Sequence, residues 1–146
     1  MTIFPTEWEN QQSPGTATGR RSAPFVSVVG FDGTAHALRA LDNAVAQLHG
    51  REGSIELVYV ADPLASTGEI SDQARAHLLP REPRWHFQRG DGNDVPDELA
   101  AAADRLRHYH GSDANIAIVV GSSTEHGDRV ARALIHRYRY PIVVVP

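Results

Sequence analysis

The chain has 146 residues, of which 41% are hydrophobic and 22% are charged, and its net charge is −4. This length provides one domain with a substantial core and is too short for two. Cysteine is absent, which excludes disulfides, thiolate catalysis and zinc–thiolate sites. The chain has no lysine, and its 14 permanently cationic side chains are all arginine, which excludes a Schiff-base or P-loop lysine; the acidic balance argues against a nucleic-acid surface.

The N-terminal segment differs in composition from the rest of the chain. Residues 10–19 are polar, contain proline and glycine, and show no hydrophobic period, so residues 1–23 are predicted to form a flexible arm. Phe4 and Trp8 leave open the alternative that the arm packs on a neighbouring surface. Apolar runs are too short for a membrane span and no secretory signal is evident, so we expect a cytoplasmic protein with no membrane partner.

Residues 24–146 are expected to form the folded domain, which begins with a strand and a helix. Residues 25–31 are apolar and β-branched, which predicts a buried strand. Apolar residues then recur at helical spacing over 34–50, with Thr34 as a candidate N-cap. A second strand is predicted over 54–60, and a helix over 71–79 is one interpretation of the ambiguous stretch that follows.

The second half of the chain repeats the alternation. Residues 84–89 predict a third strand, and a helix follows from Asp94 or Pro96 to Tyr109, where a glycine soon stops it. Residues 116–121 predict a fourth, fully apolar strand, and 141–146 a fifth. Between these two strands, apolar residues at 130, 133 and 134 indicate one face of a helix.

Apolar strands that alternate with helices are typical of a parallel sheet covered on both faces. We therefore predict an α/β domain with a single doubly wound five-stranded parallel sheet and helices on both of its faces. In such sheets a ligand binds beyond the carboxyl ends of the strands, where the strand order reverses. This places the candidate site at residues 30–34, 60–62 and 121–127.

Two of these segments contain polar groups suited to a nucleotide. Asp32 follows the first strand, where a carboxylate can accept hydrogen bonds from a ribose or a base amine, or cap a helix without any ligand. Gly121 and the hydroxyl residues after it begin the loop that follows the fourth strand. Small residues there let the backbone approach a phosphate, and the next helix points its N-terminus at the anion.

Catalytic and metal sites find little support. Ser122 follows a glycine, but nothing in the sequence places a base beside it, and no nucleophile elbow is present. His108 and His110 are two residues apart on a predicted helix, so they face different sides and cannot chelate together. We expect no catalytic residue and no metal, hence a binding protein rather than an enzyme, with slow ATP hydrolysis as an open alternative.

The order of these segments over residues 25–146 resembles the universal stress protein family. The similarity is carried by five segments: VVGFDGT (28–34), LVYVADP (57–63), GD (90–91), IVVGS (118–122) and PIVVV (141–145). In that family the domain is a doubly wound sheet, usually dimeric, and many members bind ATP. The resemblance implies a homodimer formed through the final strand, residues 141–145.

The same resemblance implies roles for individual residues. Asp32 would face the adenine and ribose, the backbone of Gly30 and Phe31 would line the adenine, and Val60 would pack on the base. The phosphates would meet a loop that opens with Val120, Gly121 and Ser122 and continues to Gly127 and Arg129.

This loop departs from the pattern of ATP-binding members, in which a second glycine follows the first after two residues and a glycine–serine or glycine–threonine pair comes later. The second glycine position is Thr124, and the later pair falls on Asp128 and Arg129, with Gly127 one place early in a shortened loop. The Thr124 side chain would hinder close approach of a phosphate, and Asp128 would repel it, whereas Arg129 would partly compensate.

Two functions from different classes follow. The first is a dimeric stress-response or regulatory protein whose nucleotide site is degenerate and binds ATP weakly or not at all. The second keeps a functional ATP or AMP site with remodelled phosphate contacts. A relative of the electron-transfer flavoproteins would share the sheet but would need additional loops that this chain lacks.

Overall fold

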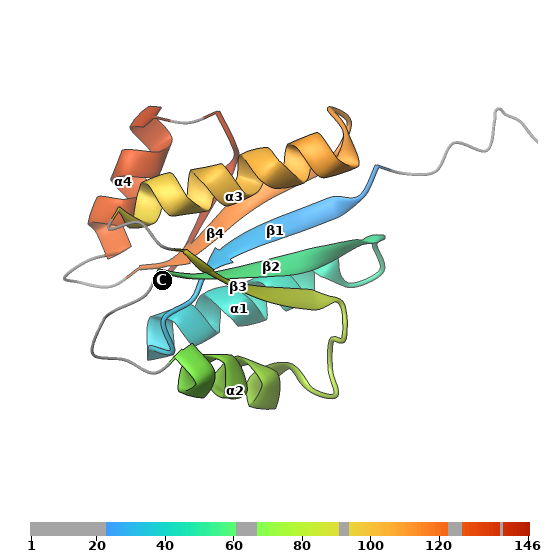
Figure 1. Ribbon diagram of the computed structural model, residues 1–146, viewed down its shortest axis with the longest axis vertical. Coiled ribbons are helices and arrows are strands. Elements are labelled where there is room, and N and C mark those ends of the chain that lie inside the picture. Colours follow the sequence, from blue (N-terminus) through green and yellow to red (C-terminus); the bar gives the residue numbers. More distant parts are fainter. Residues whose placement is uncertain (1–22, 61–66, 91–93, 123–126, 138) are drawn as a thin grey trace, which may run out of the picture.

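The computed structural model describes residues 23–60, 67–90, 94–122, 127–137 and 139–146, which form one layered domain (Figure 1). The predicted flexible arm lies outside the described residues except for its last residue, Ala23. Strands and helices alternate along the chain: β1 (Phe25–Gly30), α1 (Ala35–Leu48), β2 (Gly53–Val60), α2 (Thr67–Leu78), β3 (Trp85–Gly90), α3 (Val95–His110), β4 (Asn115–Gly121), α4 (Gly127–Arg137) and β5 (Ile142–Val145).

The strands form a single five-stranded sheet in the order β3-β2-β1-β4-β5, and every neighbouring pair is parallel. This confirms the predicted fold class. β1 is the central strand: Val28 pairs with Glu56 of β2 on one side and with Ile118 of β4 on the other. The strand order reverses between β1 and β4: β2 and β3 lie on one side of β1, and β4 and β5 lie on the other.

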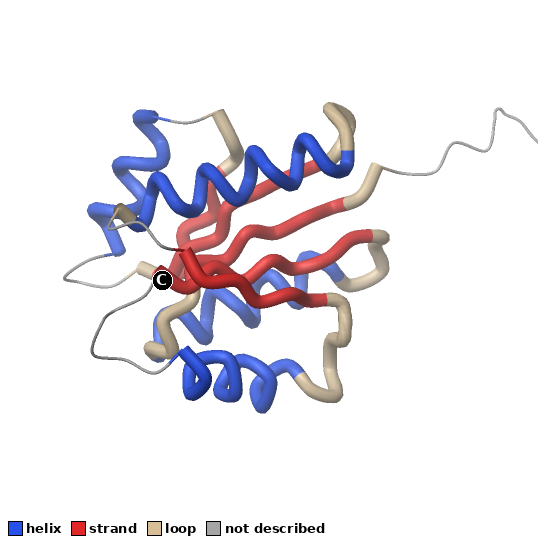
Figure 2. Tube along the Cα trace, viewed as in Figure 1, coloured by secondary structure: helices blue, strands red, loops and turns tan. Residues whose placement is uncertain are grey.

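The helices cover both faces of the sheet, with α1 and α2 on one side and α3 and α4 on the other (Figures 1 and 2). Two clusters of buried apolar side chains correspond to these faces. One joins α3 and α4 to the sheet through Leu99, Ile118 and Leu134, and the other joins α1 and α2 through Leu41 and Leu78. Strands buried on both faces account for the continuous apolar runs of β1 and β4.

Helix α2 is the element whose start was predicted least accurately. It begins at Thr67, four residues before the predicted start, and ends at Leu78. Only Ala74 and Leu78 are buried along it, so the helix has few apolar positions from which a period could be recognised.

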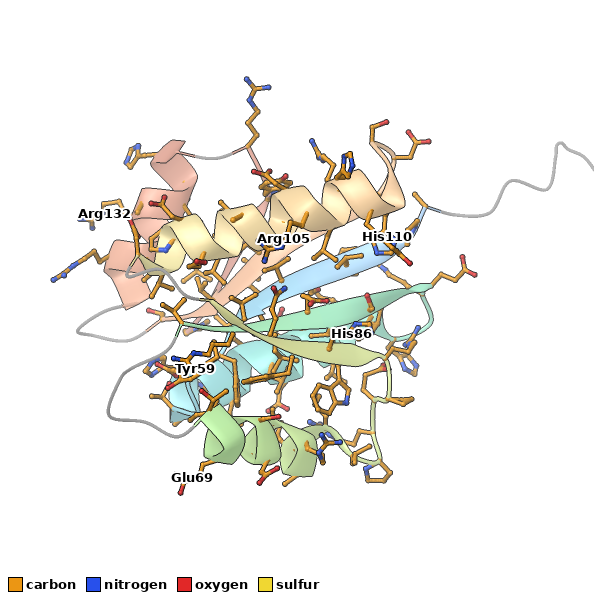
Figure 3. The ribbon with its side chains drawn as sticks, in the orientation of Figure 1. Tyr59, Glu69, His86, Arg105, His110 and Arg132 are labelled. Carbon is orange, nitrogen blue, oxygen red and sulfur yellow. The ribbon has the colours of Figure 1, made fainter. Side chains whose placement is uncertain are left out.

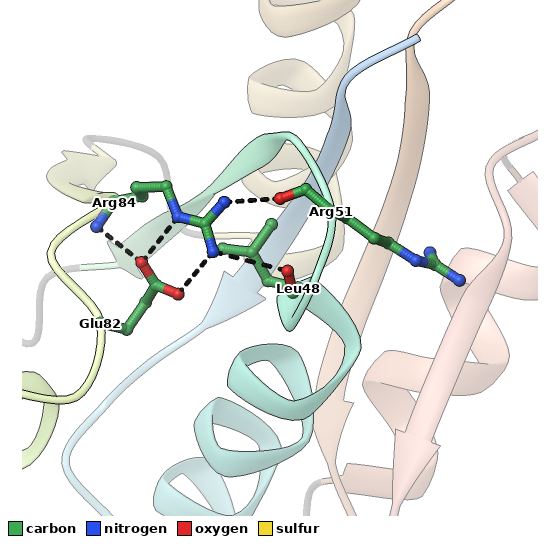
Figure 4. A network of polar contacts seen from close by, with 4 residues as sticks. All are labelled: Leu48, Arg51, Glu82 and Arg84. Atoms are coloured by element: carbon green, nitrogen blue, oxygen red, sulfur yellow. Dashed lines mark hydrogen bonds and ion pairs between the residues drawn. The ribbon is translucent and has the colours of Figure 1, made fainter. Parts of the chain in front are cut away.

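A polar network fixes the turn between α2 and β3 at the amino ends of the strands (Figure 4). Glu82 is only 5% exposed. The Arg84 guanidinium donates to both of its carboxylate oxygens, with 2.9 Å from Nε to Oε2 and from Nη2 to Oε1. Arg84 also donates from Nη1 to the carbonyl of Arg51 at 2.6 Å, so the network connects α2, β3 and the loop after α1.

Candidate functional site

A cleft of about 480 Å³ opens at the carboxyl ends of β1, β2 and β4. Its volume lies within the range of small-molecule sites, and it lies at the reversal of strand order where such folds bind ligands. The lining residues come from both halves of the chain: Gly30, Phe31, Asp32, Thr34, His36, Ala37, Val58, Tyr59, Val60, Val95, Leu99, Val120, Gly121 and Val130.

The cleft brings together six of the nine predicted site residues: Gly30, Phe31, Asp32, Val60, Val120 and Gly121. Their predicted contacts with a ligand remain predictions. Ser122 follows Gly121, and its backbone N–H donates to the carbonyl of Val145 at 2.6 Å. Gly127 is the first residue of α4 and Arg129 is exposed on the same helix, and neither is among the described residues that line the cleft. Thr124 lies outside the described residues.

The inner wall of the cleft is apolar and comes mainly from β2 and α3. Val58 and Tyr59 are buried, Leu99 is fully buried, and a side chain at Gly30 would come within 3.3 Å of Leu99. Tyr59 stacks with Phe87 of β3 at a ring-centroid distance of 6.4 Å, and Figure 3 shows it at the end of the sheet close to the start of α1. Such a wall suits an apolar, planar group, whereas polar contacts have to come from the mouth.

Polar side chains at the mouth form a chain from Asp32 through Thr34 to His36. The hydroxyl of Thr34 donates to Oδ1 of Asp32 at 2.5 Å, and the backbone N–H of Thr34 donates to the same oxygen at 3.1 Å. Nε2 of His36 lies 3.0 Å from the Thr34 hydroxyl oxygen. Thr34 also caps α1 by accepting from the N–H of Ala37 at 3.4 Å. One carboxylate oxygen of Asp32 therefore holds the turn, which leaves Oδ2 for a ligand.

Helix α2 supports this turn from the outer side. Nε2 of Gln73 donates to the carbonyl of Gly33 at 3.0 Å. Gly33 has a φ of +82°, and a side chain there would also meet Gln73 and Ile70. A glycine is therefore required between Asp32 and Thr34 both for its backbone conformation and for the contact with α2.

Gly121 has a structural role that requires no ligand. A Cβ atom at this position would overlap the backbone carbonyl of His36, where the first turn of α1 crosses the end of β4. The contact between α1 and β4 thus depends on the absence of a side chain. The sequence interpretation of Gly121 as a residue that admits a phosphate has this second explanation.

The sequence analysis placed Thr34 in the candidate segment 30–34 and at the helix cap, but it did not predict that His36, Leu99 and Val130 line the cleft. His36 is the fourth residue after Asp32, at the start of a predicted helix, and that proximity was the available signal. Leu99 and Val130 lie on helices whose position over the cleft depends on the tertiary fold. Among the described residues, no group of histidines and carboxylates could hold a metal ion.

Solved structures of universal stress proteins have the same fold. A protein of the family from Burkholderia pseudomallei is 23% identical with a TM-score of 0.59, over 83% of this chain and 95% of that one. A universal stress protein from Archaeoglobus fulgidus is 19% identical with a TM-score of 0.60, over 85% and 98%. A universal stress protein in complex with cAMP is 21% identical with a TM-score of 0.56, over 86% and 99%.

The fold and the position of the cleft define a doubly wound α/β protein with a candidate ligand site at the reversal of strand order. More particularly, its fold is that of the universal stress proteins, as the sequence resemblance implied. No family model and no curated protein matches the chain. In the part of the chain that the structure describes, none of the helices has the length and hydrophobicity needed to cross a membrane.

Proposed function

We propose that this chain is a universal stress protein-like regulatory protein whose cleft binds an adenosine-containing ligand and binds a triphosphate weakly or not at all. The observation that carries the proposal is the cleft itself, with apolar walls from β2 and α3 and the Asp32 carboxylate at its mouth. A base would pack on Val60 and the buried wall, and Oδ2 of Asp32 would accept from the ribose or the base amine. The relative in complex with cAMP supports an adenine nucleotide as the ligand class.

Weak binding of a triphosphate is proposed from the loop after β4. The loop is shortened, the second glycine of the ATP-binding pattern is Thr124, and Asp128 adds a negative charge. Arg129 is exposed at the start of α4 and is the nearby cation that would pair with a phosphate. If Arg129 compensates for the missing contacts, the alternative function, a working ATP or AMP site with remodelled phosphate contacts, applies instead.

Calorimetric titration of the purified full chain with adenosine, AMP and ATP tests the proposal. We expect adenosine to bind, and we expect ATP to bind no more tightly than adenosine. Asp32→Asn should weaken adenosine binding by about tenfold or more, because a hydrogen bond to a charged group is lost. Asp113→Asn makes the same chemical change at an exposed position before the amino end of β4 and should leave the affinity unchanged.

Three outcomes separate the possibilities. Tighter binding of ATP than of adenosine, lost in Arg129→Gln, would replace the proposal with the alternative function. Equal effects of Asp32→Asn and Asp113→Asn would contradict the site. Absence of binding by all three ligands would leave the fold without the proposed ligand function.

A homodimer is part of the proposed function. β5 is an edge strand, and Val144 on it is 39% exposed while Ile135 on the neighbouring α4 is 60% exposed. An open strand edge with apolar side chains favours pairing with a second copy of the chain. The regulatory role would then be exerted through the dimer and its partners rather than through turnover.

A further inference from the structure

The tautomer of His36 follows from a count of the hydrogen bonds at Thr34. A hydroxyl group has one proton to donate and two lone pairs to accept. The proton of Thr34 is committed to the carboxylate of Asp32, which can only accept. Nε2 of His36 lies 3.0 Å from the same hydroxyl oxygen, so Nε2 must be the donor. The second lone pair of the oxygen receives the N–H of Ala37.

This assignment fixes which ring nitrogen of His36 can accept a hydrogen bond. In neutral histidine one ring nitrogen carries the proton and the other accepts. Because Nε2 of His36 holds its proton for Thr34, Nδ1 is the accepting nitrogen. His36 and Asp32 both line the cleft, and each keeps one acceptor that its hydrogen bond to Thr34 does not use: Nδ1 of His36 and Oδ2 of Asp32.

We infer that His36 determines ligand specificity, so that the neutral imidazole favours the hydroxyl groups of a nucleoside and the protonated imidazole admits a phosphate. This inference rests on the proposed function, because it assumes an adenosine-containing ligand in the cleft. A ribose hydroxyl can donate to Nδ1, whereas a phosphate oxygen facing it would meet a second acceptor. On protonation, Nδ1 becomes a charged donor and the same position favours an anion.

Several other charged or titratable groups belong to the elements near His36, among them Arg39, one turn further along α1, which donates from Nε to the carbonyl of Pro146 at 2.9 Å. Asp32 precedes α1, and Tyr59 lines the cleft from β2. Glu98 is half-buried near the start of α3, and Arg129 is exposed on α4. Neutral Gln73 is the contact from α2. Variants at His36 itself separate its contribution from the charges of these neighbours.

The test compares adenosine with cAMP, which have the same base and sugar and whose charges stay fixed over the pH range used. Their affinities for the full chain are measured at about pH 8 and about pH 5.5, on either side of the range in which histidine side chains change charge. We expect adenosine binding to weaken at the lower pH, because a protonated Nδ1 can no longer accept from a ribose hydroxyl. We expect cAMP binding to strengthen by about threefold to fivefold at the lower pH, the size of one partly exposed charge contact.

Two variants and one spectroscopic measurement complete the experiment. His36→Gln stays neutral and should remove the pH dependence of cAMP binding, whereas His36→Arg should strengthen cAMP binding equally at both pH values. Nitrogen NMR of the free protein, with the His36 signals assigned by their loss in His36→Gln, should show a protonated Nε2 and an unprotonated Nδ1 at the higher pH. This tautomer signature requires no ligand.

The outcomes distinguish this inference from the proposed function. If both ligands bind and cAMP shows the same pH dependence in the wild type and in His36→Gln, the inference is overturned and the proposed function stands. A protonated Nδ1 in the free protein also overturns it. If neither ligand binds at either pH, the proposed function fails and the ligand preference fails with it, even where the NMR spectrum shows the expected tautomer.

Discussion

Glu56 and Glu82 are both shielded from solvent, but their surroundings differ in what they offer a negative charge. Glu56 belongs to β2, and its carboxylate accepts from Gln88 of β3 at 2.9 Å and lies 3.5 Å from His86 of the same strand. Arg105 lies on α3 (Figure 3), and its guanidinium donates to the side chain of Gln88 at 2.7 Å rather than to Glu56. Burial therefore dominates, and the pKa of Glu56 rises above its ordinary value of 4.5.

Glu56→Gln should stabilise the protein at pH 7. A raised pKa in the folded state means that the cost of the ionised carboxylate is present above that pKa and disappears as the pH falls below 4.5. Urea unfolding at pH 7 and at about pH 4 should therefore give a gain that shrinks with the pH. Glu52→Gln, an exposed control, should show no gain, and a destabilised Glu56→Gln would contradict the explanation.

Glu82 shows the opposite case. The hydrogen bonds from Arg84 hold the pKa of Glu82 below 4.5, so they stabilise the fold above the ordinary pKa, and this contribution is lost as the pH falls through the folded pKa. Glu82→Gln should lower the free energy of unfolding at pH 7 by about 2 kcal/mol, because a bidentate contact with a buried carboxylate is broken.

The exposed pair of Arg81 and Asp42, 2.9 Å apart, provides the matched control for Glu82. Arg81→Met removes an ion pair of two half-exposed side chains and should cost less than about 1 kcal/mol. Equal losses in the two variants by urea unfolding would show that burial of Glu82 adds nothing. At about pH 3 the difference between Glu82→Gln and the wild type should become smaller.

Among the elements, α1 and β4 make the contact on which the shape of the cleft depends most directly. Gly121 ends β4 directly against the backbone of His36, so the first turn of α1 is held close to the sheet. The same turn carries Thr34 and His36 at the mouth. Any residue larger than glycine must move the helix or the strand, because the atom in the way belongs to the backbone.

Gly121→Ala should therefore destabilise the fold and disturb the cleft together. We expect a loss of about 2 kcal/mol in the free energy of unfolding, in the range of an overpacked core position, with weaker adenosine binding under conditions where the variant is fully folded. Gly68→Ala, at an exposed position within α2, should be neutral or slightly stabilising. Wild-type stability in Gly121→Ala would show that the contact is easily relieved.

The strands could be predicted from the sequence because a parallel sheet buried on both faces leaves a continuous apolar run, as in β1 and β4. The start of α2 could not, because only Ala74 and Leu78 are buried along this helix and several of its other contacts are polar. His77 and Arg81 bind Asp42, and Gln73 binds Gly33. These partners lie 35 or more residues away along the chain, so no local period records them.

The candidate site also contains residues that could be predicted from the sequence and residues that could not. Asp32 comes two residues after β1 and Gly121 ends β4, and the rule for parallel sheets is sufficient to bring such positions together. Leu99 and Val130 come from the far half of the chain and lie over the cleft only because α3 and α4 pack on that face. The hydroxyl of Tyr140, a buried residue, donates to the carboxylate of Asp104 on α3, and this contact could not be predicted from the sequence either.

At the scale of the whole molecule, the proposed homodimer depends on which outer strand of the sheet is open to pairing. β3 carries polar and charged residues along its edge, including exposed His86 and Arg89, which disfavour pairing. β5 is short and apolar. Association is therefore expected at β5.

Val144→Arg should convert the expected homodimer into a monomer without unfolding it, because the side chain is exposed in the single chain and a charge there is desolvated only on pairing. Light scattering coupled to size-exclusion chromatography measures the mass of both proteins. His86→Arg, a charge placed on β3 instead, should leave the mass of the dimer unchanged. A monomeric wild type, or loss of the dimer in both variants, would contradict association through β5.

The central position of β1 also has a consequence for how the chain is made. The ribosome delivers the innermost strand first, and β2 and β3 then join it on one side before β4 and β5 are added on the other. The sheet can thus grow outward from β1 during synthesis, because none of the five strands has to be inserted between two strands that were made before it. The apolar β4, which would be prone to aggregate if it stayed unpaired, can pair at once with the open edge of β1, which has already been synthesised.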